Sequence, residues 1–275
     1  VVRCTECGAT ARYPYGGEGS ERSLVYDAAP STWHHVAGRT GTPKRLIRVS
    51  GNTETVTGYD AVIFDNDGVL VEPPAHETAV EATREAFEEV GVRHPDRAHV
   101  DGIVHGTTVE RLRETCAAYD VDVETFWRAR ERLDEQSQFE KFESGSRTLY
   151  DDVRSITDLD QPRGVVSNNH HSTVEFVLDF FDLRHAFDTY LGREKTVESL
   201  DLKKPNTYYL DQAVAELGAE SALYVGDSES DVRAAHRAGL DSAFVRRPHC
   251  RETTLSVTPT HEVDSLRDLV AVADA

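Results

Sequence analysis

Short apolar runs recur along this chain of 275 residues, and polar or acidic residues directly follow several of them. Runs typical of buried strands lie at 60–65, 163–168, 222–226 and 241–246. Between them, apolar residues mostly recur at helical spacing. Strands that alternate with helices predict an α/β fold with a doubly wound, parallel, Rossmann-like sheet. In such a sheet, the residues that follow the strands meet at one edge, where ligands bind.

Capping residues mark the ends of several predicted helices. Ser172 and Glu175 have the spacing of a capping box ahead of an apolar stripe. Asn206 is suited to begin the next helix, which Gly218 would end. A further predicted helix follows the run at 222–226 and contains Asp231.

Residues 75–148 interrupt the alternation of strands and helices. Their apolar residues form three helical stripes, the first of which stops at Gly91. Thr107 and Glu110 have capping-box spacing ahead of the second stripe. Because no strand pattern breaks this segment, we expect an all-helical insert within the α/β fold. The alternative is that these helices belong to the core of a single domain.

The charge of the chain narrows the classes of partner. The sequence holds 49 acidic and 30 basic residues, and only five of the basic residues are lysines. A surface this acidic should repel nucleic acids and anionic membranes, so we expect neither as a partner. With 39% hydrophobic residues, the chain should nevertheless fold. An excess of carboxylates with few lysines suggests a surface suited to high salt, where screening removes self-repulsion.

The four cysteines, Cys4, Cys7, Cys116 and Cys250, form no recognisable disulfide framework. This absence favours a reducing compartment. The sequence also has no signal-peptide pattern and no apolar run long enough to span a bilayer. We therefore expect a soluble, cytoplasmic protein.

Residues 1–58 differ from the rest of the chain. They carry five acids and seven bases, a net charge of +2, whereas the remaining residues carry a net charge of −21. The segment is rich in Gly, Thr and Ser without a helical period, so we expect it to be poorly ordered, or to be upstream sequence translated from a wrongly chosen start. Cys4 and Cys7 have the spacing of half a zinc ribbon, but no second pair follows. His34 and His35 are distant candidates for the missing ligands.

The most informative polar stretch is Asp65-Asn66-Asp67-Gly68, which directly follows apolar residues 61–64. Two carboxylates so close together repel each other, so they require a metal ion or a shared proton. A strand that ends in such a pair suits aspartyl nucleophile chemistry on phosphate. The glycine permits a tight bend at the two acids.

Three further polar motifs follow later strands or open helices. Ser167 and Asn168 end the second apolar run, Lys204 lies in a Lys-Lys-Pro-Asn loop, and Asp227 and Asp231 follow the third run. Together with the Asp-x-Asp-Gly motif, and in this order, they resemble the motifs of the haloacid dehalogenase-like (HAD) hydrolase superfamily. The resemblance covers about residues 59–272.

This resemblance implies a role for each acid of the first motif. Asp65 would be the nucleophile and would also bind Mg²⁺, which neutralises phosphate charge. Asp67 would protonate the leaving oxygen and later take a proton from the attacking water, while its backbone carbonyl faces the metal. Many dehalogenases of the superfamily lack this second acid, so Asp67 argues against carbon–halogen cleavage. Asn66 departs from the hydrophobic residue or Thr usual between the two acids.

The other motifs would complete the phosphate and metal sites. By resemblance, Ser167 and Asn168 would hold phosphate oxygens, and Lys204 would neutralise charge between the nucleophile and the phosphate. Asp227 would be a further carboxylate ligand of Mg²⁺. Asp231, one helical turn later, would reach the site through water or through Lys204.

The helical insert is similar to the cap that this superfamily places between its first and second motifs. We expect core segments at 59–74 and 149–275, with the cap at 75–148. The cap would select the substrate, because closure of such a domain completes the site. Polar residues near its edges are candidate ligands: His76, His105, Thr107 and Arg111.

The chain looks most like the phosphoglycolate phosphatase group. This implies a magnesium-dependent phosphohydrolase that acts on a small phosphorylated metabolite, either phosphoglycolate-like or a sugar phosphate. One alternative is a phosphosugar mutase of the β-phosphoglucomutase type, although Gly226 favours hydrolysis because some mutase relatives carry an acid there. A non-catalytic binding module with the same fold is a more distant alternative. The sequence does not indicate the oligomeric state.

The acidic composition generates a prediction about salt. We expect the midpoint of thermal unfolding to rise between about 0.1 M and about 2 M KCl, because screening weakens repulsion among the carboxylates. Circular dichroism would measure the midpoint. Sucrose, which stabilises folded proteins without screening charge, is the control. A midpoint that does not rise with KCl, or that rises no more than in sucrose, would contradict adaptation to salt.

Overall fold

The computed structural model of the chain describes residues 2–3, 10–11 and 58–274. The two short strands near the start, β1 (Val2–Arg3) and β2 (Thr10–Ala11), pair with each other in antiparallel fashion. The expectations of poor order and of a zinc site at Cys4 and Cys7 lie outside the described residues.

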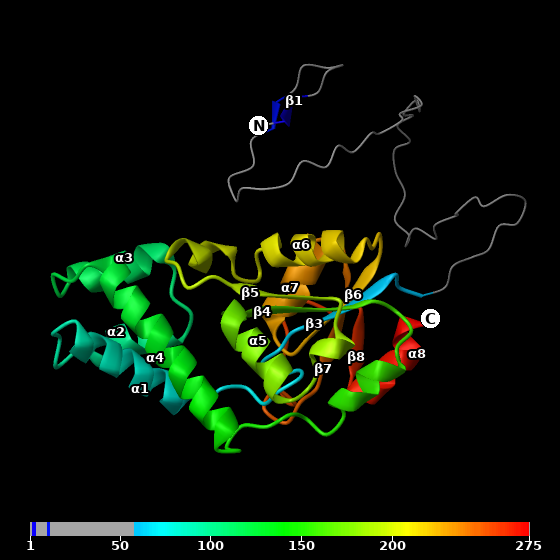
Figure 1. Ribbon diagram of the computed structural model, residues 1–275, viewed down its shortest axis with the longest axis horizontal. Coiled ribbons are helices and arrows are strands. Elements are labelled where there is room, and N and C mark those ends of the chain that lie inside the picture. Colours follow the sequence, from blue (N-terminus) through cyan, green and yellow to red (C-terminus); the bar gives the residue numbers. More distant parts are fainter. Residues whose placement is uncertain (1, 4–9, 12–57, 275) are drawn as a thin grey trace, which may run out of the picture. The chain divides into compact units, whose positions relative to one another are not determined.

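Six parallel strands form the central sheet, in the order β5–β4–β3–β6–β7–β8 (Figure 1). This confirms the predicted α/β fold with a parallel, doubly wound sheet. The four strands expected from apolar runs are present, and the sequence analysis missed β5 and β8. The strands are β3 (Ala61–Phe64), β4 (Arg163–His170), β5 (Thr189–Arg193), β6 (Ala222–Gly226), β7 (Asp241–Val245) and β8 (His261–Val263).

Helices cover both faces of the sheet, which explains why β3 is apolar at every position. Val62 and Phe64 pack into a buried cluster with side chains of α5 and α8 on one face. Ala61 and Ile63 pack with α6 and α7 on the other. Because successive side chains of a strand point to opposite faces, a strand between two helical layers must be apolar throughout. The helices are α5 (His171–Phe180), α6 (Tyr208–Leu217), α7 (Glu229–Arg237) and α8 (Leu269–Ala273).

Four helices lie between β3 and β4, where the sequence predicts an all-helical insert. They share a buried cluster that includes Phe87, Leu112 and Phe126 and that also takes in Val197 and Leu200 from the segment after β5. The insert also contacts the sheet domain, because Phe139 stacks on Phe176 of α5 with ring centroids 4.0 Å apart. The predicted boundaries at 75 and 148 stay a prediction. The helices are α1 (His76–Glu89), α2 (Arg97–Val104), α3 (Val109–Ala117) and α4 (Val123–Glu143).

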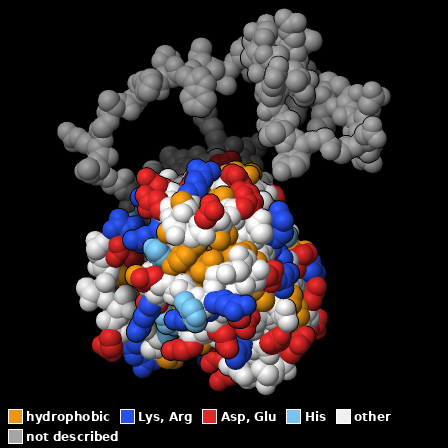
Figure 2. Space-filling model, turned by 90° about the vertical axis from the view of Figure 1, so that its left-hand side faces the viewer, with side chains coloured by type: hydrophobic (Ala, Val, Ile, Leu, Met, Phe, Trp, Pro, Cys, Tyr) orange, Lys and Arg blue, Asp and Glu red, His pale blue; other side chains and the backbone are white. Residues whose placement is uncertain are grey.

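The surface at the side of α1–α3 carries both signs of charge. Figure 2 shows acidic and basic side chains interspersed there around a small apolar patch. Among the described helices, none combines the length and the apolar character needed to cross a bilayer.

Two of the predicted helix starts are wrong by one or two residues. α5 already begins at His171, so Ser172 lies inside its first turn and donates a hydrogen bond to Glu135 instead of capping the helix. α3 is capped by Thr108, whose hydroxyl accepts from the backbone N–H of Arg111, and not by Thr107. In α3 the neighbouring threonine caps the helix, whereas the cap position of α5, His170, makes no side-chain capping hydrogen bond.

The predicted limits of α6 are close to the observed ones. Asn206 Oδ1 accepts a hydrogen bond from the backbone N–H of Tyr208, the first residue of the helix, at 2.9 Å. Gly218 ends the helix in the left-handed conformation, with φ of 64°. The loop that holds Lys204 therefore leads directly into a well-defined helix.

Candidate active site

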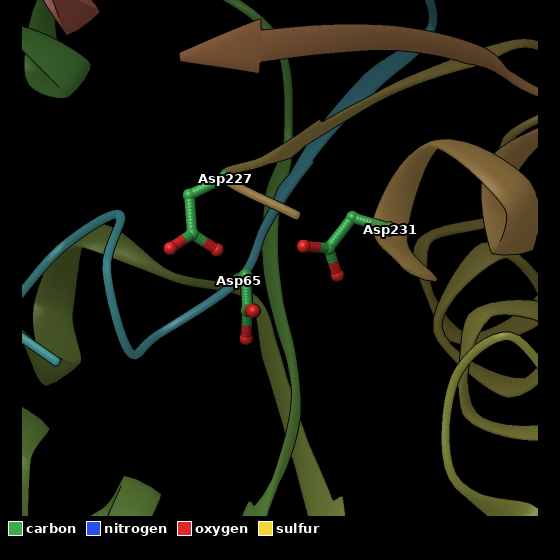
Figure 3. A group of neighbouring side chains, drawn as sticks. All are labelled: Asp65, Asp227 and Asp231. Carbon is green, nitrogen blue, oxygen red and sulfur yellow. The ribbon is translucent and has the colours of Figure 1, made fainter. Parts of the chain in front are cut away.

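Three carboxylates converge at the carboxyl edge of the sheet. Asp65 directly follows β3, Asp227 directly follows the neighbouring strand β6, and Asp231 lies in the first turn of α7. Figure 3 shows their side chains directed toward one another from these three elements. One oxygen of each lies within 4.8 Å of an oxygen of each of the others. The sheet thus gathers acids that are more than 160 residues apart in the sequence.

Lys204 lies buried between two of these acids. Its Nζ is 2.9 Å from Asp65 Oδ2 and 2.7 Å from Asp231 Oδ1. It also donates hydrogen bonds to the hydroxyl of Tyr224 and to the carbonyl of Val166. Burial alone would lower the pKa of the amine, but the attraction of Asp231 and Asp65 outweighs it and raises the pKa above its usual value. Lys204 is therefore a fixed positive charge.

One lysine does not balance the negative charge of the site. Burial raises the pKa of Asp65 well above its usual value, and Asp231, Asp227 and Asp67 add to the rise while Lys204 opposes it. The pKa of Asp227 is also raised, mainly by burial. A raised pKa means that these carboxyl groups lose their protons less readily, because too little positive charge lies nearby. A bound cation would supply that charge and stabilise the ionised carboxylates. An all-oxygen donor set with this charge deficit fits Mg²⁺.

The residues of the cluster play unequal parts in such a site. Both oxygens of Asp231 already have protein partners, since Oδ1 contacts Lys204 and Oδ2 accepts from the backbone N–H of Ser228 at 3.0 Å. Asp65 is engaged in the same way, since its Oδ1 accepts from the backbone N–H of Asn66 at 2.7 Å and its Oδ2 contacts Lys204. Within the described residues, Asp227 is contacted on one oxygen only, which makes it the acid most available as a direct ligand. Asp227 also lies 2.6 Å from Nε2 of His249, through its Oδ2.

Two glycines make room for the acids. A Cβ on Gly68, whose φ is +80°, would lie 1.9 Å from Asp227 Oδ2. A Cβ on Gly226 would lie 2.2 Å from the Cβ of Asp231. Any side chain at position 226, including the acid of some mutase relatives, would therefore displace Asp231.

Asp67 lies beside the cluster and is held by four donors. Its Oδ1 forms an ion pair with Arg147 and accepts from the side-chain amide of Asn66 at 3.2 Å. Its Oδ2 accepts from the side-chain amide of Asn169 at 2.9 Å and from the Ser167 hydroxyl at 3.4 Å. The structure thus places predicted residues Asp67 and Ser167 together.

The side chain of Asn168 forms hydrogen bonds with the backbone of Lys204, while the expected phosphate contact of its backbone N–H stays a prediction. Its Oδ1 accepts from the backbone N–H of Lys204 at 2.7 Å, and its Nδ2 donates to the Lys204 carbonyl at 3.3 Å. The amide fastens the lysine loop to the end of β4. A phosphate contact from Asn168 would therefore have to come from its backbone N–H.

The four candidate ligands on the insert do not reach the acids. The rings of His76 and His105 contact each other in a tilted arrangement, with ring centroids 4.9 Å apart. Arg111 lines a separate cavity of about 290 Å³, and the Thr107 carbonyl accepts from Lys203. In the described part of the chain, none of the four forms a hydrogen bond or ion pair with an acid of the site. Their role as substrate ligands stays a prediction.

A cleft of about 570 Å³ instead borders the site where the insert joins the sheet domain. It is lined by Arg147, which contacts Asp67, and by His249, which contacts Asp227. Neither residue, nor Asn169, was predicted from the sequence. Of the three, only Asn169 could have been suggested by its position, because it directly follows the predicted site residue Asn168. The remaining lining residues are Glu72, Pro73, Pro74, Ala75, Glu77, Thr78, Gln138, Lys141, Ser146, Tyr150 and Pro248.

Comparison with known proteins agrees with this site. A family model described as haloacid dehalogenase-like hydrolase matches residues 62–245. Phosphoglycolate phosphatase of Cereibacter sphaeroides is 26% identical over 219 residues, which cover 76% of this chain and 96% of that protein. Phosphoglycolate phosphatase of Aliivibrio fischeri is 29% identical over 195 residues, 66% of this chain and 81% of that protein. The match to (S)-2-haloacid dehalogenase of Pseudomonas putida, 27% identical, covers 43% of this chain and 52% of that protein.

Solved structures share the fold. CbbY from Rhodobacter sphaeroides in complex with phosphate superposes with a TM-score of 0.61 at 22% identity, over 79% of this chain and 100% of that one. A putative phosphoglycolate phosphatase from Lactobacillus plantarum gives a TM-score of 0.55 at 18% identity, over 78% of this chain and 99% of that one.

The contact between Gly68 and Asp227 generates a prediction. Replacement of Gly68 by Ala should lower the free energy of unfolding by at least about 2 kcal/mol, because it adds a collision to the strain of a positive φ. Gly91→Ala is the matched control, since Gly91 has φ of +91° with nothing within 4 Å of an added Cβ. The control should lose only about 1 kcal/mol in urea unfolding. Equal losses in the two variants would contradict the crowding of Gly68.

Proposed function

Because this chain belongs to the haloacid dehalogenase-like hydrolases and is a phosphatase of that family, we propose that it hydrolyses a small phosphomonoester through an aspartyl-phosphate intermediate. The observation that carries this proposal is the convergence of Asp65, Lys204 and Asp227, with Asp67 beside them. A non-catalytic binding module would have no need for buried acids whose charges are so incompletely balanced.

The residues suit two successive displacements at phosphorus. The Asp65 carboxylate attacks phosphorus, and the bond between phosphorus and the leaving oxygen breaks. Asp67 donates a proton to that oxygen as the alcohol departs, and then accepts a proton from water. The water attacks phosphorus, the bond to Asp65 breaks, and inorganic phosphate leaves. Lys204, held against Asp65, balances negative charge throughout.

The metal would be Mg²⁺, held by Asp65, Asp227 and the backbone carbonyl of Asp67, with Asp231 acting through Lys204. When bound, the ion would neutralise the charges of the phosphate and of the nucleophile, so that one anion can approach another. The raised pKa values of Asp65 and Asp227 support this proposal, because they indicate a site that lacks positive charge.

Hydrolysis is favoured over the mutase alternative by Gly226. The lack of space beside Asp231 excludes an added acid at this position. The cleft next to Arg147 and His249 is partly open to solvent, so water can enter beside the site. A mutase must instead protect its aspartyl phosphate from water.

We propose that the substrate is phosphoglycolate-like or a sugar phosphate, since the relatives with the widest coverage are named phosphoglycolate phosphatases. The helical insert at 75–148 would act as the cap that covers this substrate. Its α4 already supplies Gln138 and Lys141 to the cleft.

Replacement of the nucleophile gives the most direct test. Asp65→Asn should lower kcat for phosphate release by at least about a thousandfold, because an amide cannot form the covalent intermediate. The variant should keep the circular dichroism of the wild type. Asp182→Asn, at an aspartate that is almost fully exposed, is the control for the same chemical change. If Asp65→Asn retained a tenth of the wild-type kcat, Asp65 would not be the nucleophile.

Metal binding can be tested through enzyme activity and, independently, through thermal stability. EDTA should abolish phosphate release and added Mg²⁺ should restore it. Mg²⁺ alone should also raise the midpoint of thermal unfolding, because a ligand that binds only the folded state stabilises it. Asp227→Asn should weaken this stabilisation, whereas Asp182→Asn should not. Full activity in EDTA, or an equal Mg²⁺ effect in both variants, would contradict the proposed metal site.

A further inference from the structure

Arg147 is a buried cation on the connection that leads from α4 back to the sheet domain. Its guanidinium makes three directed contacts: Nη2 with Asp67 Oδ1, Nη1 with Gln138 Oε1 at 3.0 Å, and Nε with the carbonyl of Glu72. Only 4% of the residue is exposed. Among the described residues, Asp67 is the one carboxylate with which it forms an ion pair.

These contacts belong to a closed ring of four side chains. Asn169 donates to Asp67 Oδ2 at 2.9 Å and to Gln138 Oε1 at 2.7 Å. Gln138 in turn accepts from Arg147, which binds the other oxygen of Asp67. The members come from the loop after β3, from α4, from the connection after α4 and from the end of β4. The ring therefore joins the helical insert to the acid of the sheet domain.

The ring fixes the orientation of the Asp67 carboxylate. Arg147 donates to one oxygen of the Asp67 carboxylate and Asn169 donates to the other. The carboxylate therefore cannot rotate without breaking one of these hydrogen bonds. Leaving a buried guanidinium without its partner is strongly unfavourable. A fork of donors also holds a carboxylate in a defined plane better than a single charge does.

We propose that Arg147 is a positioning residue that aims Asp67 at the leaving oxygen of the substrate. The proposal rests on the proposed function, in which Asp67 is the proton donor. Arg147 also lines the 570 Å³ cleft, so a leaving group bound there would lie close to the guanidinium that holds Asp67. Gln138 supports the arrangement from α4 without touching Asp67.

A positioning role predicts a dependence on the leaving group. An alkoxide is strongly basic and needs a proton as it departs, whereas p-nitrophenolate departs readily without one. Misdirecting Asp67 should therefore slow the release of alcohols much more than the release of p-nitrophenol. Loss of packing alone would slow both reactions by the same factor.

The test compares kcat/KM for two substrates in the whole protein. The substrates are p-nitrophenyl phosphate and the alkyl phosphate that the wild type hydrolyses fastest. Arg147→Met keeps the length of the side chain and removes its donors. We expect kcat/KM for the alkyl phosphate to fall by about a hundredfold and that for p-nitrophenyl phosphate by less than about tenfold. Asp67→Asn should show the same selective loss.

A double variant checks whether Arg147 acts through Asp67. If it does, Arg147→Met should cause little further loss in a chain that already carries Asp67→Asn, so the two effects should be strongly non-additive. Gln138→Leu removes the ring contacts with Arg147 and Asn169. It should lower kcat/KM less than Arg147→Met does, and again more for the alkyl phosphate than for p-nitrophenyl phosphate. It provides the same comparison if Arg147→Met does not fold.

Arg163→Met is the matched control. Arg163 begins β4, at the opposite edge of the sheet from the site, and its guanidinium donates to backbone carbonyls of Leu159, Gln161 and Ala186. Its loss should lower stability without changing the ratio of kcat/KM between the two substrates.

Two results would overturn the inference while leaving the proposed function intact. One is an equal loss on both substrates in Arg147→Met. The other is a double variant in which the losses of kcat/KM caused by Arg147→Met and Asp67→Asn multiply. A wild-type protein that releases phosphate from neither substrate nor from any other phosphomonoester would instead contradict the proposed function, and the inference would fall with it.

Discussion

The buried contact of Lys204 with Asp65 and Asp231 holds the candidate active site together. The ammonium group connects the end of β3, the loop before α6 and the first turn of α7 at distances below 3 Å. It is itself held in place by Asn168, which fastens its backbone to the end of β4. Removing this charge would leave buried acids without compensation, a strongly unfavourable arrangement. The remaining features of the site are arranged around this ion pair.

Lys204 compensates only part of the negative charge of the buried acids. Burial and mutual repulsion keep the pKa values of Asp65 and Asp227 raised even with the lysine present. Glycines at 68 and 226 allow the acids to approach closely, because any larger residue would collide with them. Concentrating negative charge in this way costs the folded chain stability and suits the site to a divalent cation.

The helical insert makes two different kinds of contact with the sheet domain. The stacked rings of Phe139 and Phe176 join α4 to α5 by apolar packing. The ring that contains Gln138 and Arg147 joins the same helix to Asp67 by hydrogen bonds. A substrate in the cleft would therefore touch the connection that also holds the proposed proton donor. In the proposed mechanism, recognition of the leaving group and placement of Asp67 would share one structural element.

The sequence by itself determined the sheet domain and the acids at its edge. Apolar runs between helical stripes specify buried parallel strands, and residues directly after those strands, such as Asp65 and Asp227, must meet at the carboxyl edge. Local patterns could not reveal β5 and β8, and they placed the starts of α5 and α3 one or two residues too late or too early, because contacts with neighbouring residues decide them. Only the tertiary structure brought Arg147 and His249 to the site. They lie in irregular segments without a periodic pattern, and their partners are far away in the sequence, so their positions depend on how the whole chain packs.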